Sequence, residues 1–250
     1  MKYMGSKSRI AKHILPIILK NRKEGQCYVE PFVGGANMID KVDGWRIGAD
    51  NNRYLIAMFN GCIDGRDISI DTSKEFYSAV RDCYNKGLGA YDDFTVGLVG
   101  FMCSANGRFF EGGYSGQSKT KIGTLRDYIA ESFRGLTKQL PDLEDVKFVH
   151  SEYTNLEIPK ESIVYCDIPY QGTKQYSTSK DFDHTAFWDW CRLKAHQGHK
   201  VFISEYNAPD DFVCVWQQEV KSSLSANGKS GGNKKSIEKL FVHESQIEEA

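Results

Sequence analysis

The chain has 250 residues, enough to bury a full hydrophobic core as one large domain or as one domain with an insertion. Hydrophobic residues make up 40% of it and charged residues 26%, as in an ordinary globular protein. Lys and Arg number 32 against 33 Asp and Glu, so the net charge of -1 excludes a strong overall attraction to nucleic acid, and any such surface must come from local clusters.

The seven cysteines are scattered and never form a C-x-x-C pair, which argues against zinc sites and against a disulfide framework. The amino-terminal stretch MKYMGSKSRI has no apolar signal region, and the apolar block ILPIIL is too short to span a bilayer. We therefore expect a cytoplasmic protein with no metal and no membrane segment.

The first quarter of the chain alternates helical and strand patterns. Apolar side chains at helical spacing predict a helix within residues 8–22, and CYVEPF predicts a strand at 27–32. The segment VGGAN, residues 33–37, predicts a turn that we call the glycine turn. A second strand, RIGAD, ends at Asp50, and a helix follows at 54–63. This order is typical of parallel α/β sheets.

The middle of the chain, residues 67–145, has a different pattern. Helical periodicity starts at Phe76, again at Phe94 and again at Leu125. Between the last two helices, residues 106–124 are rich in Gly, aromatic residues and Lys, which predicts a hairpin or a long loop. We therefore expect a small, mainly helical inserted domain at 67–145, flanked by an α/β domain made of residues 1–66 and 146–250.

The α/β pattern then resumes. One helix is predicted at 183–198, and strands are predicted at 147–151, 162–166, 200–206, 212–216 and 238–243. Residues 221–239 hold five Lys and a single acid, Glu238, which predicts a mobile basic loop.

The glycine turn and Asp50 form the first candidate site. Glycines after a strand let the backbone approach a ligand, and an acid that ends the next strand can accept both hydroxyls of a ribose. The dinucleotide fingerprint G-x-G-x-x-G is absent, so a ligand of adenosine type without a pyrophosphate fits better. Taken alone, the pattern is equally compatible with an ordinary tight turn.

The second candidate site is Asp167-Ile168-Pro169-Tyr170, which follows the apolar strand residues just past the strand's carboxyl end. In isolation it would be a turn with a solvated Asp. Together with the first site it suits methyl transfer to an aromatic amine, because a carboxylate and the carbonyl of residue 168 can accept the two amine N–H bonds while Tyr170 stacks the base. Cys166, the alternative nucleophile, lies inside the strand and is interpreted as a core residue.

With these motifs in order, the chain resembles the Dam-like, D12-class DNA adenine-N6 methyltransferases of bacteria and their phages. YMGSK at Tyr3 to Lys7 looks like the family's Y-x-G-x-K, VEPFVGGAN looks like its F-x-G-x-G motif, and Asp167 to Tyr170 match D-P-P-Y. The resemblance implies a Rossmann-like S-adenosylmethionine-dependent methyltransferase sheet, with residues 67–145 as the target-recognition domain.

The resemblance also implies roles for individual residues. Asp167, Ile168, Pro169 and Tyr170 would hold the target adenine. The residues implied to line the S-adenosylmethionine site are Tyr3, Lys7, Glu30, Pro31, Phe32, Gly34, Asp50, Glu152 and Tyr153. The residues expected to contact DNA are Asn106, Arg108, Lys119, Lys121, Tyr176, Lys229, Lys234 and Lys235.

Three departures from the family pattern stand out. Ala36 replaces the last glycine of F-x-G-x-G, and Ile168 replaces the first proline of D-P-P-Y. Residues 106–114 match the recognition hairpin too loosely to assign a GATC site. The predicted function is site-specific adenine-N6 methylation of double-stranded DNA by a monomer or weak dimer, in restriction-modification, phage protection or regulation. The alternatives are an amino methyltransferase acting on cytosine N4, RNA or a protein amide, and a non-catalytic DNA-binding module.

Overall fold

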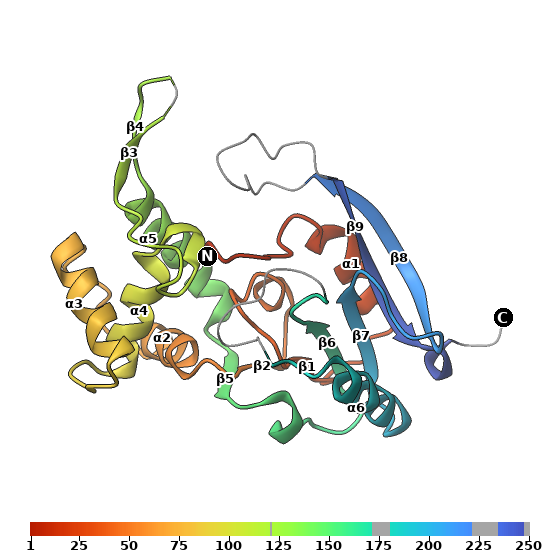
Figure 1. The fold of residues 1–250 in the computed structure, drawn as a ribbon. Coiled ribbons are helices and arrows are strands. Elements are labelled where there is room, and N and C mark those ends of the chain that lie inside the picture. The colour runs from red at the N-terminus through yellow and green to blue at the C-terminus, as the bar shows by residue number, and fades with distance from the viewer. Residues whose placement is uncertain (121, 172–180, 222–234, 248–250) are drawn as a thin grey trace. The chain divides into compact units, whose positions relative to one another are not determined.

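The computed structural model describes residues 1–120, 122–171, 181–221 and 235–247, with the backbone alone described for Lys221 and Lys235 (Figure 1). The chain forms two compact units. The first unit comprises Met1–Lys12 and Val33–Leu156, and the second comprises His13–Phe32 and Glu157–Ala250.

The described residues form helices and strands in alternation over most of the chain. The α-helices are α1 (Ala11–Ile18), α2 (Arg53–Ile63), α3 (Lys74–Asn85), α4 (Asp93–Met102), α5 (Tyr128–Gln139) and α6 (His184–His196). The strands are β1 (Tyr28–Glu30), β2 (Arg46–Asp50), β3 (Gln117–Lys119), β4 (Leu125–Asp127), β5 (Val146–His150), β6 (Ile163–Asp167), β7 (Lys200–Glu205), β8 (Phe212–Lys221) and β9 (Lys235–His243). Short 3-10 helices are η1 (Ile39–Lys41), η2 (Ala105–Gly107), η3 (Leu140–Leu143), η4 (Tyr153–Asn155) and η6 (Glu244–Gln246).

Seven of the strands form a mixed, mostly parallel sheet with the order β5-β2-β1-β6-β7-β9-β8. In the first unit β2 and β5 are parallel, and in the second unit β6 is parallel to both β1 and β7. The last two strands, β9 and β8, continue the sheet in antiparallel pairing. The predicted α/β class with a Rossmann-like parallel sheet is confirmed.

Polar residues just before the helices explain where most of the helices begin. Each of these side chains accepts a hydrogen bond from a backbone N–H in the first helical turn, which has no partner inside the helix. These capping residues are Asn52 for α2, Ser73 for α3, Asp92 for α4, Asp127 for α5 and Asp183 for α6.

The middle of the chain has its own hydrophobic cluster within the first unit. Tyr77 and Val80 of α3 pack with Val96 and Val99 of α4 and with Ile129 of α5, and all five are buried. The β3–β4 hairpin projects beyond these helices (Figure 1). The three predicted helices and the hairpin are therefore present. The third of these helices was predicted to start at Leu125, which is wrong because Leu125 lies in β4 and α5 starts at Tyr128.

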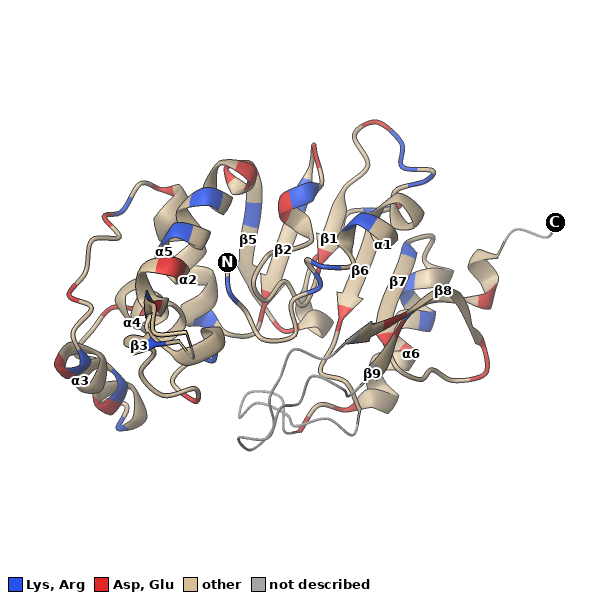
Figure 2. Ribbon diagram, turned by 90° about the horizontal axis from the view of Figure 1, so that it is seen from above, with Lys and Arg blue, Asp and Glu red and all other residues tan. Residues whose placement is uncertain are grey.

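In the second unit, α1 and α6 lie on opposite faces of β6 and β7 (Figures 1 and 2). Phe187 and Cys191 of α6 are fully buried, as are Val164 and Cys166 of β6, so this layer is the hydrophobic core of the unit. The buried position of Cys166 confirms its interpretation as a core residue.

The prediction of a single mobile loop at residues 221–239 is wrong for the part that the structure describes. Strand β8 continues to Lys221 and β9 begins at Lys235, and the two residues are paired across the ribbon. The pairing continues through Val220 with Ser236 and Glu219 with Ile237. Alternating exposed polar residues obscure this strand pattern in the sequence.

Candidate active site

In the first unit the carboxylate of Asp50, the last residue of β2, closes the glycine turn. One oxygen accepts a hydrogen bond from the backbone N–H of Gly34 at 3.1 Å, and the other accepts from the N–H of Asn52 at 2.9 Å. Burial raises the pKa of Asp50 from 3.8 to about 6 against the lowering effect of these bonds, and the charge of Glu152 adds to the rise. Each oxygen has a further lone pair, so Asp50 can accept both hydroxyls of a diol.

Tyr3 packs directly against the glycine turn. A Cβ atom on Gly34 would lie 2.9 Å from the Tyr3 ring, and one on Gly35 would lie 2.5 Å from Tyr3 Cβ. These two positions therefore accept no side chain while Tyr3 stays in place. Ala36 adopts a φ of 54°, in the left-handed region that glycine tolerates best, so the alanine that replaces the family's last glycine keeps a backbone conformation suited to glycine.

Gln139, at the end of α5, also supports the glycine turn and was missed in the sequence. Its Nε2 donates hydrogen bonds to the carbonyl oxygens of Gly35 at 3.2 Å and Ala36 at 2.9 Å, and it lies 2.9 Å from Asp40 Oδ2. The side chain is 5% exposed. The available signal was its position three residues after Leu136, on the face of α5 that also carries Ile129. Gln139 therefore links α5 to the turn.

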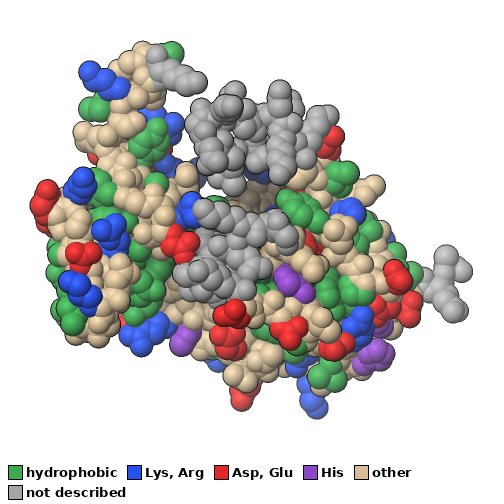
Figure 3. Space-filling view, viewed as in Figure 1, with side chains coloured by type: hydrophobic (Ala, Val, Ile, Leu, Met, Phe, Trp, Pro, Cys, Tyr) green, Lys and Arg blue, Asp and Glu red, His purple; other side chains and the backbone are tan. Residues whose placement is uncertain are grey.

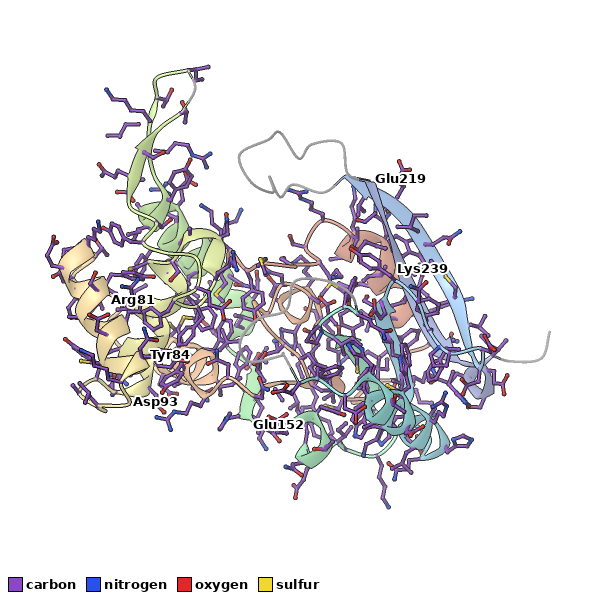
Figure 4. The ribbon with its side chains drawn as sticks, in the orientation of Figure 1. Arg81, Tyr84, Asp93, Glu152, Glu219 and Lys239 are labelled. Carbon is purple, nitrogen blue, oxygen red and sulfur yellow. The ribbon has the colours of Figure 1, made fainter. Side chains whose placement is uncertain are left out.

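Two of the remaining first-unit candidates, Glu152 and Tyr153, follow the end of β5. Asp50 and His150 are paired as the last residues of the parallel strands β2 and β5. Glu152, two residues after His150, therefore follows the carboxyl end of β5 (Figure 4). Glu152 is exposed and Tyr153 starts η4. Lys7 is 9% exposed, and its Nζ donates a hydrogen bond to the Gly5 carbonyl at 3.3 Å.

The second unit contains the other cofactor candidates. Glu30 ends β1, is 3% exposed, and accepts a hydrogen bond from the Tyr28 hydroxyl at 2.9 Å. Pro31 is buried, and the Phe32 ring makes edge contacts with Phe182 and Phe187, with 5.8 Å between centroids in each case. Glu30 is thus fixed at the carboxyl end of its strand.

The candidate catalytic residues also belong to the second unit. Asp167 is the last residue of β6, so the strand ends one residue later than the predicted end at 166, and Ile168 is buried at 4% exposure. Pro169 is half-buried, and the Tyr170 hydroxyl donates a hydrogen bond to Glu238 Oε2 at 2.8 Å. Burial, together with the charges of Asp167 and Glu238, raises the pKa of Tyr170 well above 10. Tyr170 therefore stays a neutral hydrogen-bond donor.

The structure describes half of the residues expected to contact DNA. Asn106 lies in η2 with a φ of 59°, and Lys119 is exposed on β3. Arg108 Nε is buried with no hydrogen-bond partner among the described residues, while its Nη2 lies 3.8 Å from Glu111. Lys235 begins β9, and its side chain is not described. The candidates outside the described residues are Lys121, Tyr176, Lys229 and Lys234.

The hairpin offers an exposed surface within the first unit. Leu125 is 58% exposed and Ile122 is 88% exposed. Basic and hydrophobic side chains share this surface in the space-filling view (Figure 3). Arg126 makes hydrogen bonds of 2.8 and 2.6 Å to the two carboxylate oxygens of Glu131, which join β4 to α5. The hairpin is thereby anchored at its base.

Membrane-spanning helices and metal sites are both absent from the described residues. No helix among them is long and apolar enough to cross a membrane. Within the same ranges, no group of three or more His, Cys, Asp or Glu side chains is arranged to hold a metal ion.

Part of the chain matches a known family. Residues 3–89 match the family model described as D12 class N6 adenine-specific DNA methyltransferase, which is the family predicted from the ordered motifs. The matched range contains Tyr3, Lys7, the glycine turn and Asp50, whereas Asp167 and Tyr170 lie beyond it. No curated protein matches the chain.

Proposed function

We propose that the chain, whose residues 3–89 match the family model of D12 class N6 adenine-specific DNA methyltransferases, transfers the methyl group of S-adenosylmethionine to the N6 amine of an adenine extruded from duplex DNA. The observation that carries the proposal is the position of Asp167. It ends β6, a buried strand with parallel neighbours on both sides, and the carboxyl edge of such a sheet is where ligands bind.

The residues of the first unit fit the nucleoside part of the cofactor. Asp50 offers one further lone pair on each oxygen, which suits the two ribose hydroxyls, and the glycine turn brings backbone close to that carboxylate. Tyr3, Lys7, Glu152 and Tyr153 complete the part of the proposed site that this unit provides. Glu30, Pro31 and Phe32, at the end of β1 in the second unit, are proposed separately as cofactor contacts. When bound, S-adenosylmethionine would supply an electrophilic methyl group, and breaking of its S–CH3 bond would leave S-adenosylhomocysteine.

The end of β6 fits the target amine. The Asp167 carboxylate and the carbonyl of Ile168 would accept the two N–H bonds of the adenine amine and aim its lone pair at the methyl group. The nitrogen needs no strong base, because its proton leaves only after the new N–C bond has formed. Tyr170 would stack on the base. Its ring is 8% exposed, so stacking requires the ring to be uncovered when DNA binds.

We propose that residues 67–145 form the target-recognition domain and that residues 1–66 and 146–250 form the catalytic domain. The separate hydrophobic cluster of α3, α4 and α5 and the exposed hairpin support this division. Lys119 and Asn106 would contact DNA from this domain, and the lysines between β8 and β9 would contact phosphates.

The test is incubation with double-stranded DNA and methyl-labelled S-adenosylmethionine, followed by digestion to nucleosides. We expect the label in N6-methyl-2′-deoxyadenosine. Label only in N4- or C5-methylcytosine, in RNA or in protein would identify one of the alternative acceptors. Binding of DNA without label in any acceptor would indicate a non-catalytic DNA-binding module.

A further inference from the structure

Two carboxylates from neighbouring strands hold the residues that directly follow Pro169. Glu238 of β9 accepts the hydrogen bond of the Tyr170 hydroxyl at 2.8 Å. Glu205, the last residue of β7, accepts a hydrogen bond from the backbone N–H of Gln171 at 2.6 Å and another from the N–H of Tyr206. The ring and the following peptide group of Tyr170 are therefore both bound to acidic side chains.

Strand register explains why these side chains meet. Asp167 of β6 is paired with Ser204 of β7, so Glu205 is one position beyond that pair. Glu205 is in turn paired with Lys239 of β9, and Glu238 immediately precedes Lys239 (Figure 4). Three adjacent strands of the second unit thus bring Asp167, Glu205 and Glu238 to the same edge.

Burial makes these contacts strong. Glu205 is 2% exposed, and hydrogen bonds from backbone N–H groups to a buried carboxylate are charge-assisted. The Tyr206 ring adds an edge contact to the Tyr170 ring, with 4.6 Å between centroids and 79° between planes. Tyr170 is consequently restrained at its hydroxyl, at its ring and at the peptide bond that follows it.

We propose that Glu205 and Glu238 are positioning residues that hold Tyr170 in place for the target base, an inference that rests on the proposed function. A stacked base reacts fastest when the amine stays aligned with the methyl group, and a mobile tyrosine would relax that alignment. Pro169 fixes the backbone φ before Tyr170, and Glu205 fixes the peptide after it. Glu238 fixes the ring between them through the hydroxyl.

A double-mutant cycle tests the Glu238 contact. Glu238→Ala and Tyr170→Phe should each lower the single-turnover methylation rate at saturating DNA and cofactor by about threefold to tenfold, as expected for one hydrogen bond. The double variant should match Tyr170→Phe alone, because both changes remove the same bond. Glu238→Gln should recover part of the rate, since its amide oxygen still accepts. Fold losses that multiply in the double variant would overturn the proposal.

The control is Glu244→Gln, an exposed acid in η6 of the same unit, which should retain the wild-type rate. Affinity for S-adenosylhomocysteine should be unchanged in every variant of the cycle. A loss of that affinity equal to the loss of rate would show a general structural role and contradict a positioning role.

Nuclear magnetic resonance tests the Glu205 contact without any activity. In protein labelled with 15N-glutamine, Glu205→Gln should move the Gln171 amide proton upfield and speed its exchange with solvent, because a carboxylate acceptor is lost. An unmoved Gln171 resonance would contradict the contact. If Glu205→Gln does not fold, the Glu238 cycle decides. If the wild-type protein fails to methylate DNA, the proposed function is wrong. The Gln171 resonance still tests whether the Glu205 carboxylate binds the Gln171 N–H.

Discussion

The glycine turn of the first unit and the end of β6 in the second unit use acids in different ways. At the glycine turn a single carboxylate, Asp50, accepts hydrogen bonds from the backbone N–H of Gly34 in the turn and from that of Asn52, two residues after Asp50. Burial raises the pKa of Asp50 to about 6. At the end of β6, Asp167 is accompanied by Glu205 and Glu238 from two later strands. The first arrangement suits binding of neutral hydroxyls, and the second suits fixing an aromatic ring beside a reacting amine.

The largest expected effect comes from Asp167→Ala. Removing an acceptor that matters in the transition state should lower the turnover by about 10²–10³-fold, while affinity for S-adenosylhomocysteine stays close to that of the wild type. Single-turnover methylation and calorimetric titration measure the two quantities. Asp210→Ala, an exposed acid of the same unit, is the control. Near-normal turnover of Asp167→Ala would remove this residue from the chemistry.

Asp50→Ala should act on the cofactor instead. Two ribose hydroxyls lose a charged acceptor, so the binding free energy of S-adenosylhomocysteine should weaken by about 1.5–3 kcal/mol. Calorimetric titration measures the change, and Asp64→Ala after α2 serves as a control with the same loss of charge. Unchanged affinity would exclude Asp50 from the cofactor site.

The raised pKa of Asp50 predicts opposite pH trends for binding and folding. Protonation below pH 6 removes the acceptor, so affinity for S-adenosylhomocysteine should fall by up to about tenfold per pH unit. The folded protein binds this proton more tightly than the unfolded chain does. The contribution of Asp50 to stability is therefore fully present below pH 3.8 and is lost as the pH rises through 6. Asp50→Asn should remove both trends, measured by titration and by urea unfolding across this range.

Gln139→Leu should have a smaller effect on the same region. It leaves the buried carbonyl oxygens of Gly35 and Ala36 without their donor, which costs about 1–3 kcal/mol of folding stability and loosens the turn. Cofactor affinity should fall by less than in Asp50→Ala. Lys138→Leu, at an exposed neighbouring position of α5, should change neither quantity. Equal effects of the two substitutions would argue against a role of Gln139 in the turn.

Ile168→Pro should have the smallest effect on turnover, less than about tenfold or ~1.4 kcal/mol in the barrier. Residue 168 is needed for its carbonyl, and Ile168 is buried at 4% exposure while Pro169 already restricts its backbone. Single-turnover methylation compares the variant with the wild type. An inert wild type that gains activity as Ile168→Pro would show that this isoleucine marks a lost catalyst.

The same difference between the two regions explains what could be predicted from sequence. Asp50 and Asp167 were found because each is an acid that ends an apolar strand, a local pattern. Glu205 ends the apolar strand KVFISE in the same way, so that signal could have found it. Glu238 could not be found, because its contact depends on the register of β9 against β7.

Element boundaries were less predictable than element types. The last helix of the inserted segment starts at Tyr128 because the Asp127 side chain accepts a hydrogen bond from the Ala130 N–H, whereas apolar spacing alone extends the helix back to Leu125. Asp is a residue type favoured at helix caps, so Asp127 was an available signal, but the start of the helix was predicted from apolar spacing alone. Long-range pairing likewise extended β8 and β9 beyond their apolar centres.

The central claim is that the glycine turn acts on cofactor binding and the end of β6 acts on methyl transfer. The most direct test is whether excess cofactor restores the methylation rate of a variant in each region. Single-turnover methylation of one duplex should be measured for Asp50→Ala and Asp167→Ala while S-adenosylmethionine is raised to saturation. If Asp50 acts on binding and Asp167 on chemistry, Asp50→Ala should recover most of the wild-type rate and Asp167→Ala should recover none. Recovery of Asp167→Ala by excess cofactor, or an Asp50→Ala variant that stays inactive at saturation, would contradict the account.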